Sequence, residues 1–151
     1  MSDQDLAPPD AELRALLLTR PVVAVVGASI NPARPSHEVM EALIDLGYDA
    51  IPVNPAYPEV LGRKAYPDLA SIPRRIDLVD VFRRAGATPD VARQAVAVGA
   101  RVLWLQIGVV SEEARRIAAA AGLVVVMDRC LRVEHDRLVG APFAPREPGA
   151  G

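Results

Sequence analysis

Residues 22–29 read Val22-Val23-Ala24-Val25-Val26-Gly27-Ala28-Ser29 and set the architecture of this chain. The first five are apolar at every position, whereas a strand with one solvated face would alternate apolar and polar residues. This run therefore predicts a central strand of a parallel sheet with helices on both faces. Gly27 then breaks the strand and starts the turn into a helix.

Working outward, four more apolar runs alternate with helical patterns. We expect strands at 49–53, 77–82, 102–107 and 123–127, a short helix around 67–72, and longer helices at 11–18, from Ser36 to Gly47, from Thr88 to Gly99 and from Ser111 to Gly122. Asp10, Thr88 and Ser111 are predicted as N-caps, because short polar side chains accept bonds from the free amides of a first helical turn. The alternation predicts a doubly wound, Rossmann-like α/β fold with a parallel sheet of about five strands.

Composition predicts a single domain and excludes several classes of protein. The 151 residues suffice for one core, and no apolar run is long enough to cross a bilayer. We divide the chain into a leading helix (1–20), one α/β domain (21–140) and a flexible tail (141–151) rich in proline and glycine. The net charge of −2 and the lack of a basic stripe argue against nucleic acid as a partner.

The N-terminus, the cysteine count and the usual symmetry of oligomers bear on cellular location and assembly. Residues 1–10 lack the basic start of a secretory signal, and Cys130 is the single cysteine, so no intramolecular disulfide forms. We therefore expect a cytoplasmic protein with no membrane partner. A homodimer is the expected assembly, because two-fold dimers are the commonest soluble oligomers.

The ligand site is expected at the carboxyl ends of the strands, near the point where the strand order reverses. The residues in that position are Gly27, Ala28, Ser29, Asn54, Pro55, Val81, Phe82, Arg83, Gln106 and Gly108. The helix that starts at Ser36 adds amide groups suited to an anion, and Arg34 adds a charge-assisted bond. An ordinary tight turn at Gly27 and solvated arginines at 83 and 84 are the alternative interpretation.

An NAD(P)-binding Rossmann domain of an oxidoreductase or redox sensor is the alternative function. The first turn reads Gly-Ala-Ser-Ile-Asn-Pro and lacks the later glycines of the G-x-G-x-x-G fingerprint. The second strand ends in Val53-Asn54, without the carboxylate that would bind the ribose hydroxyls. The alternative therefore rests on the fold alone.

The remaining conspicuous residues favour structural roles. Trp104 is mid-strand and is expected in the core. His37 and His135 are not spaced as a metal pair, so we expect a helix-start histidine and a surface histidine and no metal site. Cys130 is interpreted as a small buried residue, with thiol exchange as the alternative.

The chain also resembles the small coenzyme A-binding proteins, relatives of the nucleotide domain in the α subunit of succinyl-CoA synthetase. The resemblance covers about residues 21–138 and rests on ordered motifs: Val26-Gly27-Ala28-Ser29, Arg34-Pro35-Ser36, Gly47-Tyr48, Val53-Asn54-Pro55, Asp80-Val81-Phe82-Arg83, Leu103-Trp104-Leu105-Gln106-Ile107-Gly108 and Met127-Asp128-Arg129-Cys130. It implies coenzyme A as the ligand, with phosphates at the first turn and helix start. It also implies adenosine and pantetheine along the residues after strands two to four. Ala56 departs from the pattern, since a lysine often follows Asn-Pro in that family.

Catalysis by this chain alone is not expected. The synthetase subunit carries its phosphorylated histidine in a second domain, for which 151 residues leave no room. No nucleophile with a base and no carboxylate pair shares a loop. We therefore expect a coenzyme A or acyl-CoA binding protein that is not an enzyme. Two further hypotheses are exchange of Cys130 with CoA disulfide and a separately encoded catalytic partner.

Overall fold

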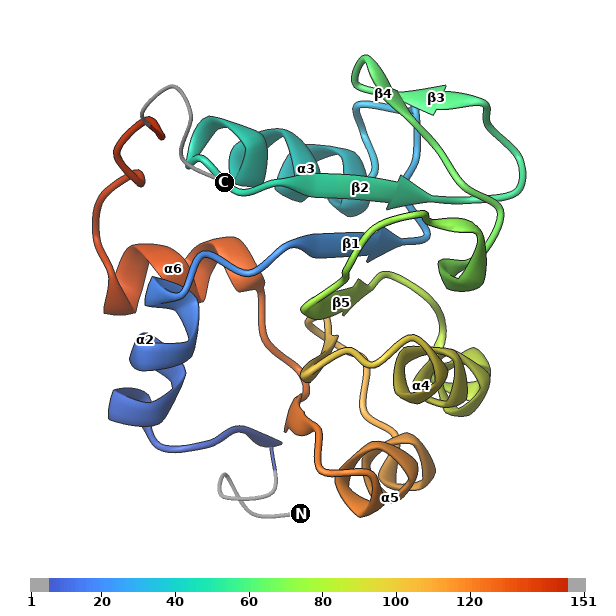
Figure 1. Cartoon of the computed structure of the whole chain (residues 1–151), viewed down its shortest axis with the longest axis vertical. Helices are drawn as coiled ribbons and strands as arrows, with labels where there is room; N and C mark the ends of the chain where they lie inside the picture. The colour runs from blue at the N-terminus through green and yellow to red at the C-terminus, as the bar shows by residue number, and fades with distance from the viewer. Residues whose placement is uncertain (1–5, 147–151) are drawn as a thin grey trace.

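The computed structural model describes residues 6–146, and a five-stranded parallel sheet forms its centre (Figure 1). The strands are β1 (Val23–Val26), β2 (Ala50–Val53), β5 (Leu78–Val81), β6 (Val102–Leu105) and β7 (Val124–Val126), in the spatial order β2-β1-β5-β6-β7. Val23 of β1 lies opposite Ala50 of β2 and Leu78 of β5. The predicted doubly wound α/β fold is confirmed, and its strand order reverses between β1 and β5.

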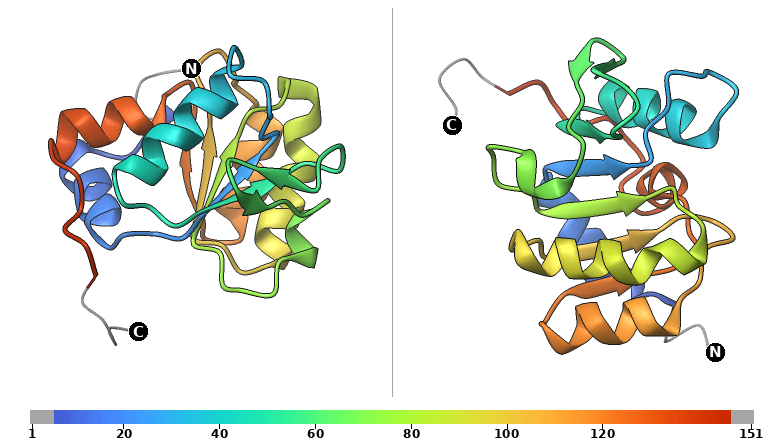
Figure 2. Two further views of the ribbon diagram at one scale, coloured as in Figure 1. Left: turned by 90° about the horizontal axis from the view of Figure 1, so that it is seen from above. Right: turned by 90° about the vertical axis from the view of Figure 1, so that its right-hand side faces the viewer.

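Helices cover both faces of the sheet, as Figure 2 shows from two further directions. One face carries α2 (Asp10–Leu18), α3 (Pro35–Asp45) and α6 (Leu131–Leu138), and the other carries α4 (Thr88–Ala97) and α5 (Glu112–Ala120). Val23 and Val25 of β1 join the first core, whereas Ala24 and Val26 join the second. Alternate residues of a strand point to opposite faces, so a strand between two helix layers is apolar throughout.

Of the three predicted N-caps, only Ser111 is confirmed, since its hydroxyl accepts from the amide of Ala114 at 3.1 Å. Asp10 is instead the first residue of α2, and its carboxylate accepts from Arg137 of α6 at 2.7 Å. Thr88 begins α4 directly after the 3₁₀ turn Ala85–Ala87, and its hydroxyl donates to the carbonyl of Ala85.

Four short or polar elements were not predicted correctly from the sequence. β3 (Glu59–Val60) and β4 (Arg63–Lys64) form a two-residue antiparallel pair, too short for an apolar pattern to be detected. The expected helix at 67–72 is only a 3₁₀ turn, Leu69–Ser71. Helix α6 was missed because half of the residues in its sequence, LRVEHDRL, are charged.

Ala141 and Phe143, within the tail that was predicted to be flexible from Ala141, contact the α3 and α6 layer. The amide of Phe143 donates to the carbonyl of Leu46 at 2.8 Å, and its ring meets Tyr48 and His135 edge-on. Residues 147–151 lie outside the described residues. The domain division itself stays a prediction.

His135 is fully buried, which corrects the expected surface position. The phenol of Tyr48 donates to Nδ1 of His135 at 2.7 Å, because Nε2 of His135 already donates to the carbonyl of Ala141 at 2.7 Å. Burial raises the pKa of Tyr48 well above its ordinary value. Tertiary contacts of this kind leave no local signal in the sequence.

None of the helices within residues 6–146 combines the length and the apolar character needed to cross a membrane.

Candidate functional site

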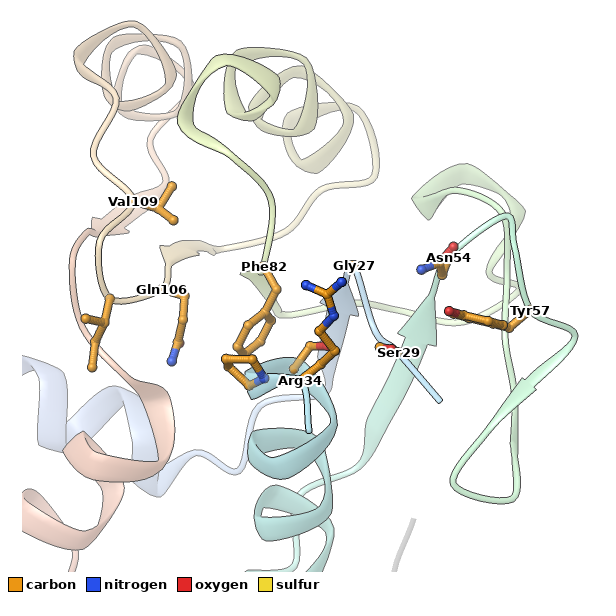
Figure 3. Close-up of a pocket in the computed structure, with 11 residues that line it drawn as sticks. Gly27, Ser29, Arg34, Asn54, Tyr57, Phe82, Gln106 and Val109 are labelled. Carbon is orange, nitrogen blue, oxygen red and sulfur yellow. The ribbon is translucent and has the colours of Figure 1, made fainter. Parts of the chain in front are cut away.

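Two adjoining hollows lie at the carboxyl ends of the strands. The main cleft, about 390 Å³, is drawn in Figure 3 and is lined by Gly27, Ser29, Arg34, Pro35, Ser36, Asn54, Tyr57, Phe82, Gln106, Ile107 and Val109. The side cleft, about 420 Å³, is lined by Val26, Gly27, Val53, Asn54, Pro55, Pro67, Asp68, Arg83, Ala87, Asp90, Val91 and Gln94. Gly27 and Asn54 border both hollows. The site therefore lies where the strand order reverses, as open α/β sheets generally place it.

Gly27 determines how tightly the first turn passes over the sheet. Its φ of +89° is one that residues with a side chain rarely adopt, and its amide donates to the carbonyl of Val53 at 2.9 Å. A Cβ atom at this position would lie 2.5 Å from the carbonyl oxygen of Phe82. Only glycine fits here without moving the end of β5.

The turn continues into the N-terminus of α3 through short hydrogen bonds. The hydroxyl of Ser29 accepts from the amide of Asn31 at 3.1 Å, and Nδ1 of His37 donates to the carbonyl of Ser29 at 2.9 Å. His37 is therefore the helix-start histidine that was expected. Ser36, which is buried, lines the cleft beside the exposed Arg34. A helix N-terminus with an adjacent guanidinium favours an anion.

Asn54 shapes the site by bonding within the protein. Its Nδ2 donates to the carbonyl of Ala28 at 2.9 Å, and its Oδ1 accepts from the amide of Ala56 at 2.9 Å. The amide thereby ties the turn after β2 to the turn after β1. Ala28 itself is fully buried, so it takes part through its backbone.

Tyr57, three residues after Asn54, lines the cleft and was missed, although an aromatic residue so soon after Asn-Pro was a usable signal.

The ends of β5 and β6 form the other part of the main cleft. Phe82 is half-buried, and Gln106 is only 7% exposed with no partner for its Oε1. Ile107 and Val109 also line this part and were missed, because single apolar residues in a loop are common. In the side cleft, Arg83 is exposed.

Four predicted residues line neither hollow: Ala28, Val81, Gly108 and Cys130. Val81 is fully buried in β5, and its carbonyl accepts from the amide of Gln106 at 3.3 Å. Gly108 donates its amide to Oδ1 of Asp128 at 2.7 Å. Cys130 is 7% exposed and occupies the N-cap position of α6 in the apolar core. Its exchange with CoA disulfide stays a prediction.

Residues 21–136 match the family described as the CoA binding domain. The chain belongs to this family. It is 44% identical over 128 residues to YneT, an uncharacterized protein of Bacillus subtilis strain 168, covering 85% of this chain and 95% of that protein. A solved structure of a hypothetical protein from Pyrococcus horikoshii OT3 superposes with a TM-score of 0.85 at 43% identity, covering 87% of this chain and 93% of that one.

A CoA-binding domain of this kind also occurs within a larger enzyme. Acetate–CoA ligase (ADP-forming) I of Archaeoglobus fulgidus is 25% identical over 141 residues, which cover 86% of this chain but 21% of the ligase. This relationship confirms the resemblance to the synthetase-type CoA-binding domains that the motifs indicated.

Beneath the cleft of this CoA-binding domain lies a buried carboxyl that the sequence did not single out. Asp80 is in the middle of β5, opposite Val25 of β1 and Trp104 of β6. It is fully buried, and neither of its side-chain oxygens has a hydrogen-bond partner. Burial raises its pKa to about 8. At neutral pH the side chain is therefore a protonated acid.

Trp104 is in the core as expected.

Replacement of Gly27 by alanine tests the tight turn. We expect Gly27→Ala to lower the free energy of unfolding by about 1–3 kcal/mol more than Gly62→Ala, measured by urea denaturation. Gly62 is a matched control, since its φ is also positive at +74° but a Cβ there would meet nothing within 4 Å. Equal losses in the two variants would show that the contact with Phe82 is unimportant.

The carboxyl of Asp80 makes stability depend on pH. The pKa of Asp80 is about 8 in the folded protein and about 3.8 in the unfolded chain. Protonated Asp80 therefore contributes to the free energy of unfolding fully below about pH 4, and this contribution is lost as the pH rises to 8. The loss is about 1.4 kcal/mol per pH unit, the slope for one proton. Between pH 5 and 8 we expect the free energy of unfolding to fall less in Asp80→Asn than in the wild type. Parallel pH profiles would contradict the assignment.

Proposed function

We propose that this chain binds coenzyme A or its acyl thioesters across the two clefts. The observation that carries the proposal is a first turn built for an anion in a chain of the CoA-binding family. Gly27 allows the backbone to come close, while α3 points its N-terminus at the main cleft and Arg34 stands beside it. Phosphates are the anions that such helix N-termini commonly receive.

The distribution of side chains supports one orientation of the ligand. In Figure 3, Asn54 and Tyr57 lie on one side of Phe82, and Gln106 and Val109 lie on the other. The end with Asn54 and Tyr57 is the polar one and adjoins the side cleft, where Arg83 supplies a second guanidinium. We place the adenosine and its phosphates at this end.

The pantetheine arm then extends toward β6. Ile107 and Val109 offer apolar contacts, and Ile107 is 62% exposed at the mouth of the cleft. Pantetheine combines an apolar chain with two amide groups, which suits apolar walls with few polar groups. An acyl group on the thiol would continue along the same apolar end.

Binding of NAD(P) is the second candidate, and Asn54 argues against it. Both functional atoms of its side chain are already bonded to Ala28 and Ala56. Asn54 is also neutral, so the end of β2 offers no carboxylate for the two ribose hydroxyls that an NAD site holds.

We also propose that the chain is a binding protein and not an enzyme. Asp80 and Cys130 are buried, and residues 6–146 contain no group of three side chains able to hold a metal ion. A homodimer, a cytoplasmic location and a separate catalytic partner stay predictions.

Calorimetric titration tests the function directly. We expect CoA and acetyl-CoA to bind, and NAD⁺ in excess to leave bound CoA undisplaced. Absence of heat with CoA up to millimolar concentration would refute the proposal, and displacement of CoA by NAD⁺ would favour the second candidate.

A pair of adjacent arginines provides a matched test of the phosphate contact. Arg83→Ala is expected to weaken CoA binding by about 1–3 kcal/mol, the range for a charge-assisted hydrogen bond. Arg84→Ala is the control, because Arg84 is also exposed and lines neither cleft. The same affinity in both variants would remove Arg83 from the site.

A further inference from the structure

Two neighbouring buried side chains, Asp80 and Gln106, have polar atoms without partners. Both oxygens of Asp80 and Oε1 of Gln106 are buried without a hydrogen bond. An unpaired polar group in a core costs free energy, and an unpaired charge costs far more. Two such groups close together require a physical reason.

The sheet brings the two side chains onto one face. Asp80 of β5 lies opposite Trp104 of β6, and Gln106 is two residues beyond Trp104, so all three point to the α3 and α6 side. The amide of Gln106 donates to the carbonyl of Val81, which continues the pairing of these strands past Leu105. With a rise of about 3.3 Å per residue and a strand spacing of about 4.8 Å, such diagonal neighbours in a parallel pair have Cα atoms about 8 Å apart, within reach of a long side chain.

Among residues 6–146, no charged group on this face pairs with Asp80. β1 and β6 contribute only apolar residues beside it, and the buried residues of α3 are Ser36, Val39, Met40 and Leu43. On α6, Glu134 bonds to Arg137 and His135 bonds to Tyr48, while Cys130 precedes the helix. Burial alone acts on the carboxyl, which keeps its proton at neutral pH.

Each group supplies what the other lacks. A protonated carboxyl carries one O–H donor, and Oε1 of Gln106 is an acceptor without a donor. We infer that Asp80 is a positioning residue that donates its proton to Oε1 of Gln106, directly or through one buried water. The bond orients the Gln106 amide with Oε1 toward the core and Nε2 toward the main cleft, into which Gln106 points (Figure 3).

This orientation selects the ligand group that Gln106 binds, and the step rests on the proposed function. An Nε2 that faces the cleft donates, so it takes a carbonyl oxygen of a pantetheine amide or of a thioester. Once Asp80 ionises, its carboxylate attracts Nε2 and leaves Oε1 facing the cleft. Two carbonyl oxygens then oppose each other, and binding weakens.

Acetyl-CoA is the probe for the binding arm, because its thiol is blocked and does not titrate. From pH 7 to 9.5 we expect wild-type affinity to fall about 5- to 10-fold, the effect of one lost hydrogen bond. Asp80→Asn retains a donor and does not titrate, so its affinity should stay near the wild-type value at pH 7 and show no such fall. Asp80→Leu should bind about 5- to 10-fold more weakly at pH 7 while folding at least as stably. The same affinity and pH profile in all three proteins would overturn the inference.

An NMR titration of the free protein separates this inference from the proposed function. The side-chain amide signals of Gln106, assigned with Gln106→Glu, should titrate with a midpoint near pH 8 in the wild type and not in Asp80→Asn. The amide of Gln94 is the internal control, since it bonds to the exposed Asp90 instead. Gln106 signals that do not move near pH 8 would refute the coupling even if acetyl-CoA binds. Failure of acetyl-CoA to bind would refute only the proposed function.

Discussion

The close approach of Gly27 to the carbonyl of Phe82 is the contact on which the cleft depends. It allows the turn after β1 to pass directly over the end of β5, where the order of strands reverses. The N-terminus of α3 is thereby held beside the ends of β5 and β6, and the backbone at Gly27 borders both hollows. A side chain there would push these parts away from each other, since protein interiors have little free space.

The sheet that supports this contact is apolar except at one position. Strands β1, β2, β5 and β6 are buried throughout, and Asp80 is the one ionisable residue within them. An apolar residue of similar size would remove an unpaired polar group from the core. Proteins tolerate such local costs mainly at functional sites. The position of Asp80 one step below Phe82 and Gln106 agrees with that pattern.

How far the sequence predicts the molecule depends on whether a feature is local. The run Val22–Val26 and the turn at Gly27 carry their signal in consecutive residues, and the fold class and the position of the candidate cleft could be predicted from such local patterns. Helix α6 could not, because its packing depends on a few apolar residues among charged ones. The burial of His135 depends on Tyr48, 87 positions away. The unpaired state of Asp80 could not be predicted, since a strand pattern does not reveal which polar residue lacks a partner.

Native mass spectrometry of the protein as purified from its expression host, repeated after addition of equal concentrations of CoA and NAD⁺, tests CoA binding directly. We expect a mass excess equal to one CoA per chain, present at purification or formed on addition, with no NAD⁺ adduct. An NAD⁺ adduct in place of CoA, or a bare chain in the presence of both, would refute CoA binding.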